Sequence, residues 1–149
     1  MGMTRQAPAR RPTGMEKIML RTLARVLGVI VALLAIVGFF IEGEHLLGLM
    51  NVDLALDVLR LIIAAALLYV GFGRASASAV RAVVIVVGVL YVLMGLLAFA
   101  DPTLFGLLPT GFTGFDIGFH LIVGLGALVL AFLPASRTAG TTAAGTDRR

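Results

Sequence analysis

Four ionisable residues stand in or beside long apolar segments, and their spacing could support chemistry. Asp57 and Arg60 are three positions apart and Asp116 and His120 are four apart, so each pair shares one face if its segment is helical. Ionisable groups inside a membrane-spanning segment are costly and are functional candidates by default. Together these four side chains could bind an anion at two helix N-termini, relay protons through His120 or gate a small pathway.

The same residues also have a structural interpretation, which we favour. Asp53 or Asp57, and Asp116, stand where a carboxylate would cap a helix that starts there. Each aspartate would then pair with its basic neighbour and lock the adjoining loop to the helices. The outermost turn of a span is hydrated, so charges at that level cost little.

A zinc site is a weaker alternative for the same region. Its ligands would be His45 and His120 with Glu44 or Asp116. Two histidines at no recognised metal spacing, without an HExxH or His-x-His pattern, are weak support for such a site. We therefore expect no metal and no other cofactor.

The rest of the chain offers little for catalysis. The sequence has no cysteine, which excludes disulfides, thiolate metal sites and cysteine nucleophiles. The serines near the apolar segments, Ser76, Ser78 and Ser136, are expected on the side of the membrane opposite both histidines, so no Ser-His-Asp triad is supported. No Walker loop or dinucleotide-binding fingerprint occurs. We expect that the protein is not an enzyme.

The composition of the chain indicates which kind of secondary structure carries these residues. Of the 149 residues, 60% are hydrophobic and 13% are charged, and the mean hydropathy is +1.07. A soluble domain carries about 25% charged residues, so the chain is expected to be an integral membrane protein. Four apolar segments, at about 22–41, 54–73, 82–100 and 117–136, are each long enough to cross the hydrocarbon core as a helix. Four strands cannot close a barrel, so helices are the only way to satisfy the backbone in lipid.

The predicted fold is therefore an all-α membrane protein, a four-helix transmembrane bundle over residues 22–133. Residues 1–21 are basic and interrupted by prolines, and residues 137–149 belong to a tail rich in Ala, Gly and Thr. Both ends are expected to be disordered and cytoplasmic.

Charge is sorted between the two sides of these segments. Eleven of the 12 basic residues precede or begin the first segment, lie in the short link 74–81 or belong to the tail, whereas the two longer loops and the segment starts that follow them hold six acids and only Arg60. The positive-inside tendency then predicts that both termini face the cytoplasm and that the longer loops face outward. The net charge of +4 reflects this topology and contact with anionic lipid. Nucleic acid is not expected as a partner, because no aromatic-and-basic module accompanies the arginines.

The two halves of the chain resemble each other. Arg25 and Arg81 precede the first and third segments, and the motifs LLGLM at 46–50 and LFGLL at 104–108 stand in the two longer loops. Asp57 and Asp116 align in the same way. We predict a duplicated helical hairpin, with both copies pointing the same way across the membrane.

The four segments, the apolar outer loops with glycine, and the series Asp116, His120 and Gly124 entering the last segment resemble a family of small bacterial membrane proteins. That family is catalogued only as a domain of unknown function and is common in actinobacteria. The resemblance covers about residues 21–132 and implies a multi-pass protein of the bacterial cell membrane, but it implies no activity. The family tends to carry a second histidine where this chain has Arg60, which argues against a symmetric two-histidine function.

Two functions remain open from the sequence. The first is a non-enzymatic structural or accessory role in the bilayer, with a polar cluster at the outer ends of spans two and four. The second is an oligomeric small transporter or channel subunit that uses this cluster. Glycines and alanines inside the segments would allow close helix packing within the bundle, in a homo-oligomer or in a larger membrane complex.

Overall fold

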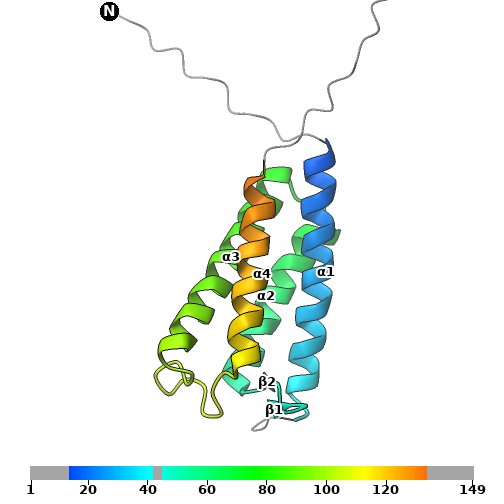
Figure 1. The fold of residues 1–149 in the computed structure, drawn as a ribbon. Helices are drawn as coiled ribbons and strands as arrows, with labels where there is room; N and C mark the ends of the chain where they lie inside the picture. The colour runs from blue at the N-terminus through cyan, green and yellow to red at the C-terminus, as the bar shows by residue number, and fades with distance from the viewer. Residues whose placement is uncertain (1–13, 42–44, 134–149) are drawn as a thin grey trace, which may run out of the picture.

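Four helices form the part of the chain that the computed structural model describes, residues 14–41 and 45–133. They are α1 (Gly14–Gly38), α2 (Leu54–Phe72), α3 (Ala77–Ala100) and α4 (Gly114–Phe132). α1 packs on α2 and α3 packs on α4, so the bundle consists of two helical hairpins side by side (Figure 1). The turn between α2 and α3 lies at one end, which we call the turn end. The loops that join α1 to α2 and α3 to α4 lie at the other, the loop end (Figure 1).

The outer surface of the bundle is apolar. Each of the four helices is long and apolar enough to cross a membrane, and less than half of each span is buried inside the protein. Large aliphatic side chains such as Ile62, Val86 and Ile122 are more than 60% exposed. An apolar belt of this length is typical of a surface that faces the hydrocarbon core of a membrane. The chain is therefore a small multi-pass membrane protein, and the predicted bundle of four helices in two hairpins is confirmed.

Two helices, α1 and α3, extend further toward the turn end than the predicted spans. α1 begins at Gly14 instead of Thr22, so residues 14–21, which were expected to be disordered, are helical. Their polar side chains find partners in the bundle. Glu16 forms an ion pair with Arg81 at 3.2 Å, and Arg21 donates to the carbonyl oxygen of Gly73 at 2.8 Å. The predicted disorder of residues 1–13 and 137–149 concerns residues that lie outside the described ranges.

A short β-hairpin at the loop end was not predicted. β1 (His45–Leu46) pairs antiparallel with β2 (Met50–Asn51), with Leu46 opposite Met50. At its tip Leu47 and Gly48 both have positive φ, 54° and 70°. In the second loop, Phe105 and Gly106 have φ of 61° and 86°. These pairs occupy the same positions in the LLGLM and LFGLL motifs.

Both hairpins are closed at the turn end by an arginine. The Nε atom of Arg25 donates to the carbonyl oxygen of Gly71 at 2.7 Å, and that of Arg81 donates to the carbonyl oxygen of Ala131 at 2.7 Å. Each guanidinium therefore caps the C-terminal end of the second helix of its hairpin, where free carbonyls and the helix dipole favour a cation.

Candidate functional site

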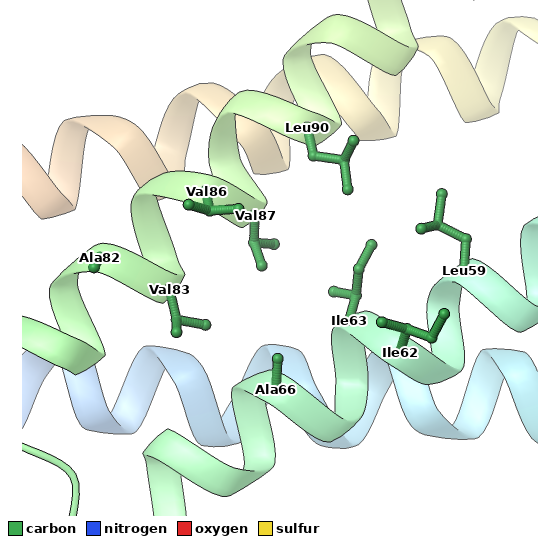
Figure 2. A pocket seen from close by; sticks show the side chains of 9 residues that line it. All are labelled: Leu59, Ile62, Ile63, Ala66, Ala82, Val83, Val86, Val87 and Leu90. Atoms are coloured by element: carbon green, nitrogen blue, oxygen red, sulfur yellow. The ribbon is translucent and has the colours of Figure 1, made fainter.

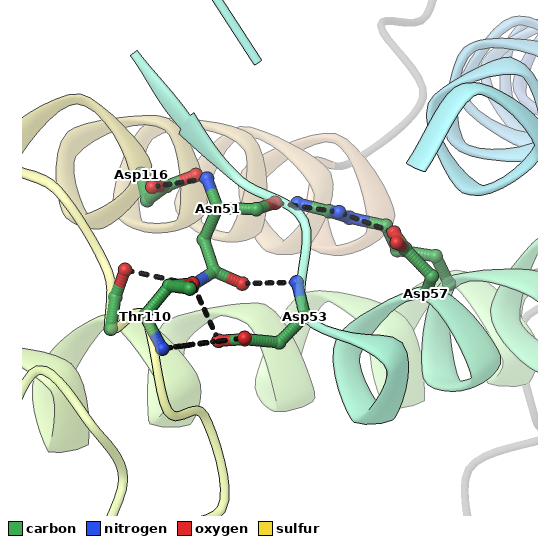
Figure 3. Close-up of polar contacts among 7 residues, drawn as sticks. Asn51, Asp53, Asp57, Thr110 and Asp116 are labelled. Atoms are coloured by element: carbon green, nitrogen blue, oxygen red, sulfur yellow. Dashed lines mark hydrogen bonds and ion pairs between the residues drawn. The ribbon is translucent and has the colours of Figure 1, made fainter. Parts of the chain in front are cut away.

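The loop end encloses buried polar residues that come from both hairpins (Figure 3). Together with two half-buried threonines they form what we call the polar cluster; its members are the buried Asn51, Asp53, Asp57, Arg60, Asp116 and His120 and the half-buried Thr110 and Thr113. As whole residues, Asn51, Asp57 and Asp116 are 0% exposed. The four residues predicted as a site therefore lie in one region, and they are joined through residues that were not predicted.

The backbone of Asn51 connects the two predicted pairs. Its N–H donates to Oδ2 of Asp116 at 2.9 Å, and its carbonyl oxygen accepts from Nη1 of Arg60 at 2.9 Å (Figure 3). Asp116 belongs to α4 and Arg60 to α2, so this one residue bonds to both hairpins.

The side chain of Asn51 connects the two loops. Its Nδ2 atom lies 2.7 Å from Oδ2 of Asp53, 2.6 Å from Oγ1 of Thr110 and 2.8 Å from the carbonyl oxygen of Gly111 (Figure 3). An amide group has two hydrogens, so these three acceptors share them. Its Oδ1 atom accepts from the backbone N–H of Asp53 at 3.0 Å. All polar atoms of this buried amide are thus satisfied.

Asp53 occupies the predicted cap position of α2 but does not cap the helix with its side chain. Its carboxylate instead accepts from Thr110, from the hydroxyl at 2.8 Å and from the backbone N–H at 3.2 Å. The prediction of a capping carboxylate is wrong here, because the second loop offers donors that a sequence pattern local to α2 does not reveal.

Asp57 and Arg60 form the predicted pair. Oδ1 of Asp57 lies 2.6 Å from Nη1 of Arg60, and the two side chains are 1% and 6% exposed. The Asp57 carboxylate packs against the end of α1, where a Cβ added to Gly38 would overlap its Oδ2 atom. Nη2 of Arg60 is buried and has no hydrogen-bond partner among the described residues.

Asp116 and His120 are neighbours, but not through the predicted carboxylate–imidazole contact. Nδ1 of His120 lies 2.7 Å from the backbone carbonyl oxygen of Asp116. The carboxylate belongs to a capping box in which Oγ1 of Thr113 accepts from the N–H of Asp116 at 3.1 Å and Oδ2 of Asp116 accepts from the N–H of Thr113 at 3.0 Å. Thr113 is therefore the N-cap residue of α4, and Asp116 is the reciprocal acid.

Aromatic rings hold the imidazole of His120 in place. The ring centroids of Tyr91 and Phe112 lie 4.8 Å and 4.7 Å from that of His120, and Phe119 approaches its edge at 6.0 Å. His120 is 3% exposed. Phe112 also belongs to a small apolar core with Leu108, which packs the loop between α3 and α4 against the helices.

The residues considered for zinc do not gather into a site in the described part of the chain. Nε2 of His45 lies 3.2 Å from the carbonyl oxygen of Gly111, whereas His120 is packed among aromatic rings. Glu44 lies outside the described residues. Within those residues no group of three or more His, Asp or Glu side chains could hold a metal ion.

Asp101 organises the second loop just outside α3. Its carboxylate accepts from the hydroxyl of Thr103 at 2.8 Å, from the backbone N–H of Thr103 at 2.9 Å and from the N–H of Phe105 at 3.1 Å. These hydrogen bonds lower the pKa of Asp101 below its ordinary value, and the one from the Thr103 hydroxyl contributes most.

Sequence reasoning missed Asn51, Thr110 and Thr113. A signal for one of them was present, because Thr113 and Asp116 form the Thr-x-x-Asp pattern that often precedes a helix. Asn51 and Thr110 carry no such signal, since the partners that link them to the other hairpin lie 57 to 65 positions away.

Comparison with curated proteins and with solved structures gave no match. A family model described as "Domain of unknown function (DUF4383)" matches residues 21–133, which include the whole polar cluster, α1 from Arg21 onward and the other three helices. Because the match covers most of the chain, the protein belongs to this family of unknown function, in agreement with the resemblance in its sequence.

Proposed function

We propose that this membrane protein has a structural or accessory role without enzymatic activity, and that its polar cluster is a latch. The latch joins the two hairpins at the loop end, so that the bundle presents one fixed shape to the bilayer and to a larger membrane complex. Such a role needs a rigid polar contact and no substrate.

The observation that carries this proposal is that hydrogen bonds of the polar cluster run from one hairpin to the other. Asn51 and Asp53, which precede α2, bond to Thr110 and Asp116, which precede or begin α4. Thr113 also donates to the carbonyl oxygen of Leu49. Five of the eight residues of the cluster therefore bond to the other hairpin, and buried hydrogen bonds of this kind rigidify a structure.

The sequence of α4 supports the same conclusion. From Leu121 to Leu133 there is no polar side chain. Proton relays and ion pathways across membranes use chains of polar or ionisable groups. None continues from His120 along α4 toward the turn end.

A transporter or channel subunit is the second candidate, and two buried atoms favour it. Nη2 of Arg60 and Oδ1 of Asp116 have no hydrogen-bond partner within the described ranges. Groups of this kind could receive a transported ion or a proton. This candidate would place His120 and Arg60 in the pathway.

Flux measurements decide between the two candidates. The purified protein is reconstituted in liposomes, and proton and ion fluxes are measured for the wild type, for His120→Ala and for Leu107→Ala, whose side chain is 63% exposed in the second loop. The latch predicts that all three proteoliposomes match empty liposomes. Wild-type flux that His120→Ala abolishes and Leu107→Ala preserves would contradict the latch and establish transport.

We also propose that the loop end faces outward from a bacterial cytoplasmic membrane. Of the described charged residues, five basic ones (Lys17, Arg21, Arg25, Arg74 and Arg81) and Glu16 lie toward the turn end, whereas four acidic ones (Asp53, Asp57, Asp101 and Asp116) and Arg60 lie toward the loop end. Positive residues are retained on the cytoplasmic side. In intact cells, a cysteine at Leu107 should therefore react with an impermeant maleimide, and a cysteine at Ser78 should not. The reverse pattern would contradict this orientation.

A further inference from the structure

The two hairpins leave an apolar groove between α2 and α3 (Figure 2). Its volume is about 310 Å³, and only aliphatic side chains line it, among them Ile62 and Ala66 of α2 and Ala82 and Val86 of α3. Ile62 and Val86 are 62% and 65% exposed, so the groove opens sideways toward the lipid. Ala66 and Ala82 are its members nearest the turn end, where their small side chains leave it open.

The size of the groove favours a hydrocarbon chain as its occupant. A helix with its side chains is about 10 to 12 Å across, which is too wide for a hollow of about 310 Å³. A cavity of about 150 Å³ in a protein core accepts a benzene molecule. The groove therefore has room for a segment of an acyl chain.

The charges beyond the end of the groove favour an anionic headgroup. Arg74 lies in the turn that joins α2 to α3, is exposed, and makes no hydrogen bond or ion pair with any described residue. Arg21 adds a second positive charge at this turn, since its guanidinium donates to the carbonyl oxygens of Gly73 and Ala75. No acid occurs between residues 58 and 100. Glu16 is already paired with Arg81.

We propose that this groove is a binding site for one anionic phospholipid. An acyl chain lies between α2 and α3, and the headgroup phosphate lies at the turn end beside Arg74. The start of α3 adds backbone N–H groups and the positive end of a helix dipole at the same level. This site is separate from the polar cluster and does not depend on the function proposed for it.

Native mass spectrometry tests the headgroup. The delipidated protein is mixed with equal amounts of phosphatidylglycerol and phosphatidylcholine that carry the same acyl chains, and bound lipid is counted. We expect the wild type to retain one phosphatidylglycerol about fivefold over phosphatidylcholine, the factor expected from one basic residue near a lipid surface. In Arg74→Gln the preference should fall most of the way toward onefold, because only the hydrogen-bonded guanidinium of Arg21 then remains at the turn. Equal retention of the two lipids by the wild type would overturn the proposal.

Two substitutions test the groove from opposite walls. Ala66→Phe and Ala82→Leu fill it, and each should abolish the bound phosphatidylglycerol while the far-UV circular dichroism stays helical. Leu125→Phe is the matched control, because Leu125 is 53% exposed on α4 and does not line the groove. Lipid retention unchanged in both filled variants would overturn the site. A dimer of the wild type that both filled variants convert to a monomer would assign the groove to a second copy of the chain instead.

Discussion

Asn51 is the residue with the most connections in the polar cluster. Its backbone bonds to one residue of each hairpin, and its amide bonds to both loops while it is 0% exposed. Removing such a side chain leaves the carboxylate of Asp53 and the hydroxyl of Thr110 with fewer partners in a buried site. Unsatisfied buried groups are more expensive than the loss of the hydrogen bonds themselves.

We expect Asn51→Ala to lower the free energy of unfolding by about 2 to 3 kcal/mol, because several buried acceptors lose their donor at once. The measurement is helical ellipticity during a titration with sodium dodecyl sulfate in mixed micelles. Leu107→Ala, a change in an exposed part of the second loop, should alter stability by less than about 0.5 kcal/mol. If Asn51→Ala is as stable as Leu107→Ala, the side chain of Asn51 is not needed for stability and the expectation is wrong.

Because the pKa of Asp101 is lowered, we expect the stability of the protein to depend on pH through this residue. Its pKa in the folded protein is lowered by hydrogen bonds from Thr103 and Phe105. The folded state therefore binds this proton less readily than the unfolded state, so the carboxylate contributes stability above its unfolded pKa. That contribution is lost as the pH falls through the lower, folded-state pKa.

The corresponding comparison is between the wild type and Asp101→Asn. At neutral pH the wild type should melt at the higher temperature, and the difference should shrink as the solution is acidified below the ordinary pKa of 3.8. A difference in melting temperature that stays constant down to acid pH would contradict this role of the carboxylate.

The sequence revealed the charged members of the cluster but not what connects them. Asp57, Arg60, Asp116 and His120 were found because charge is conspicuous in apolar segments. Asn51 and Thr110 are uncharged loop residues whose importance arises from contacts across the two hairpins. The carboxylate–imidazole pair expected from helical spacing was replaced by a capping box, because Thr113 competes for the same carboxylate.

At the scale of elements, glycines determine how closely the helices of each hairpin approach. A Cβ added to Gly124 would lie 2.8 Å from the backbone nitrogen of Val92 and 2.9 Å from the carbonyl oxygen of Gly88. At Gly126, two positions along the same helix, an added Cβ would meet no neighbouring side chain or helix within 4 Å. The glycines of α4 are therefore not equivalent.

This difference gives a matched pair of variants. Gly124→Ala should lower the free energy of unfolding by about 1 to 3 kcal/mol, because backbone atoms must move to admit the methyl group. Gly126→Ala should be neutral or stabilising by up to about 1 kcal/mol through helix propensity. Both are compared by the same detergent titration, and a larger loss for Gly126→Ala would contradict the packing of α3 on α4.

The length of the apolar segments was enough to predict the four helices. It was not enough to predict the residues at which they begin and end. The predicted start at Thr22 excluded residues 14–21 because they are polar, but Glu16 and Arg21 are accommodated by Arg81 and by carbonyls of the turn. The β-hairpin was missed because its strands have two residues each and no alternating pattern is visible at that length.

Matched features in the two halves agree with the predicted duplication. Leu47 and Gly48 adopt positive φ, as do Phe105 and Gly106 at the aligned positions. Leucine and phenylalanine rarely adopt this conformation, so its recurrence at aligned positions is more specific than shared apolar composition. The capping contacts of Arg25 and Arg81 are repeated in the same manner. Duplication of an ancestral hairpin stays a prediction that these features support.

At the scale of the whole molecule, the two hairpins are joined differently along their length. Toward the turn end they share an apolar core that includes Leu20, Val80 and Val84. Between α2 and α3 they leave the groove that faces the lipid. At the loop end the polar cluster joins them, which the segregation of charge in the sequence did not reveal.

The distance between the hairpins at the loop end tests the latch most directly. Spin labels at Leu47 and Leu107, both exposed, can be attached to introduced cysteines because the chain has none of its own. A second pair, at Tyr69 and Val129, reports on the rest of the bundle. Double electron–electron resonance should give one narrow distance at the loop end in the wild type and a broad distribution in Asn51→Ala, with the second pair unchanged. An equally narrow loop-end distance in Asn51→Ala would contradict the claim that the polar cluster holds the hairpins together.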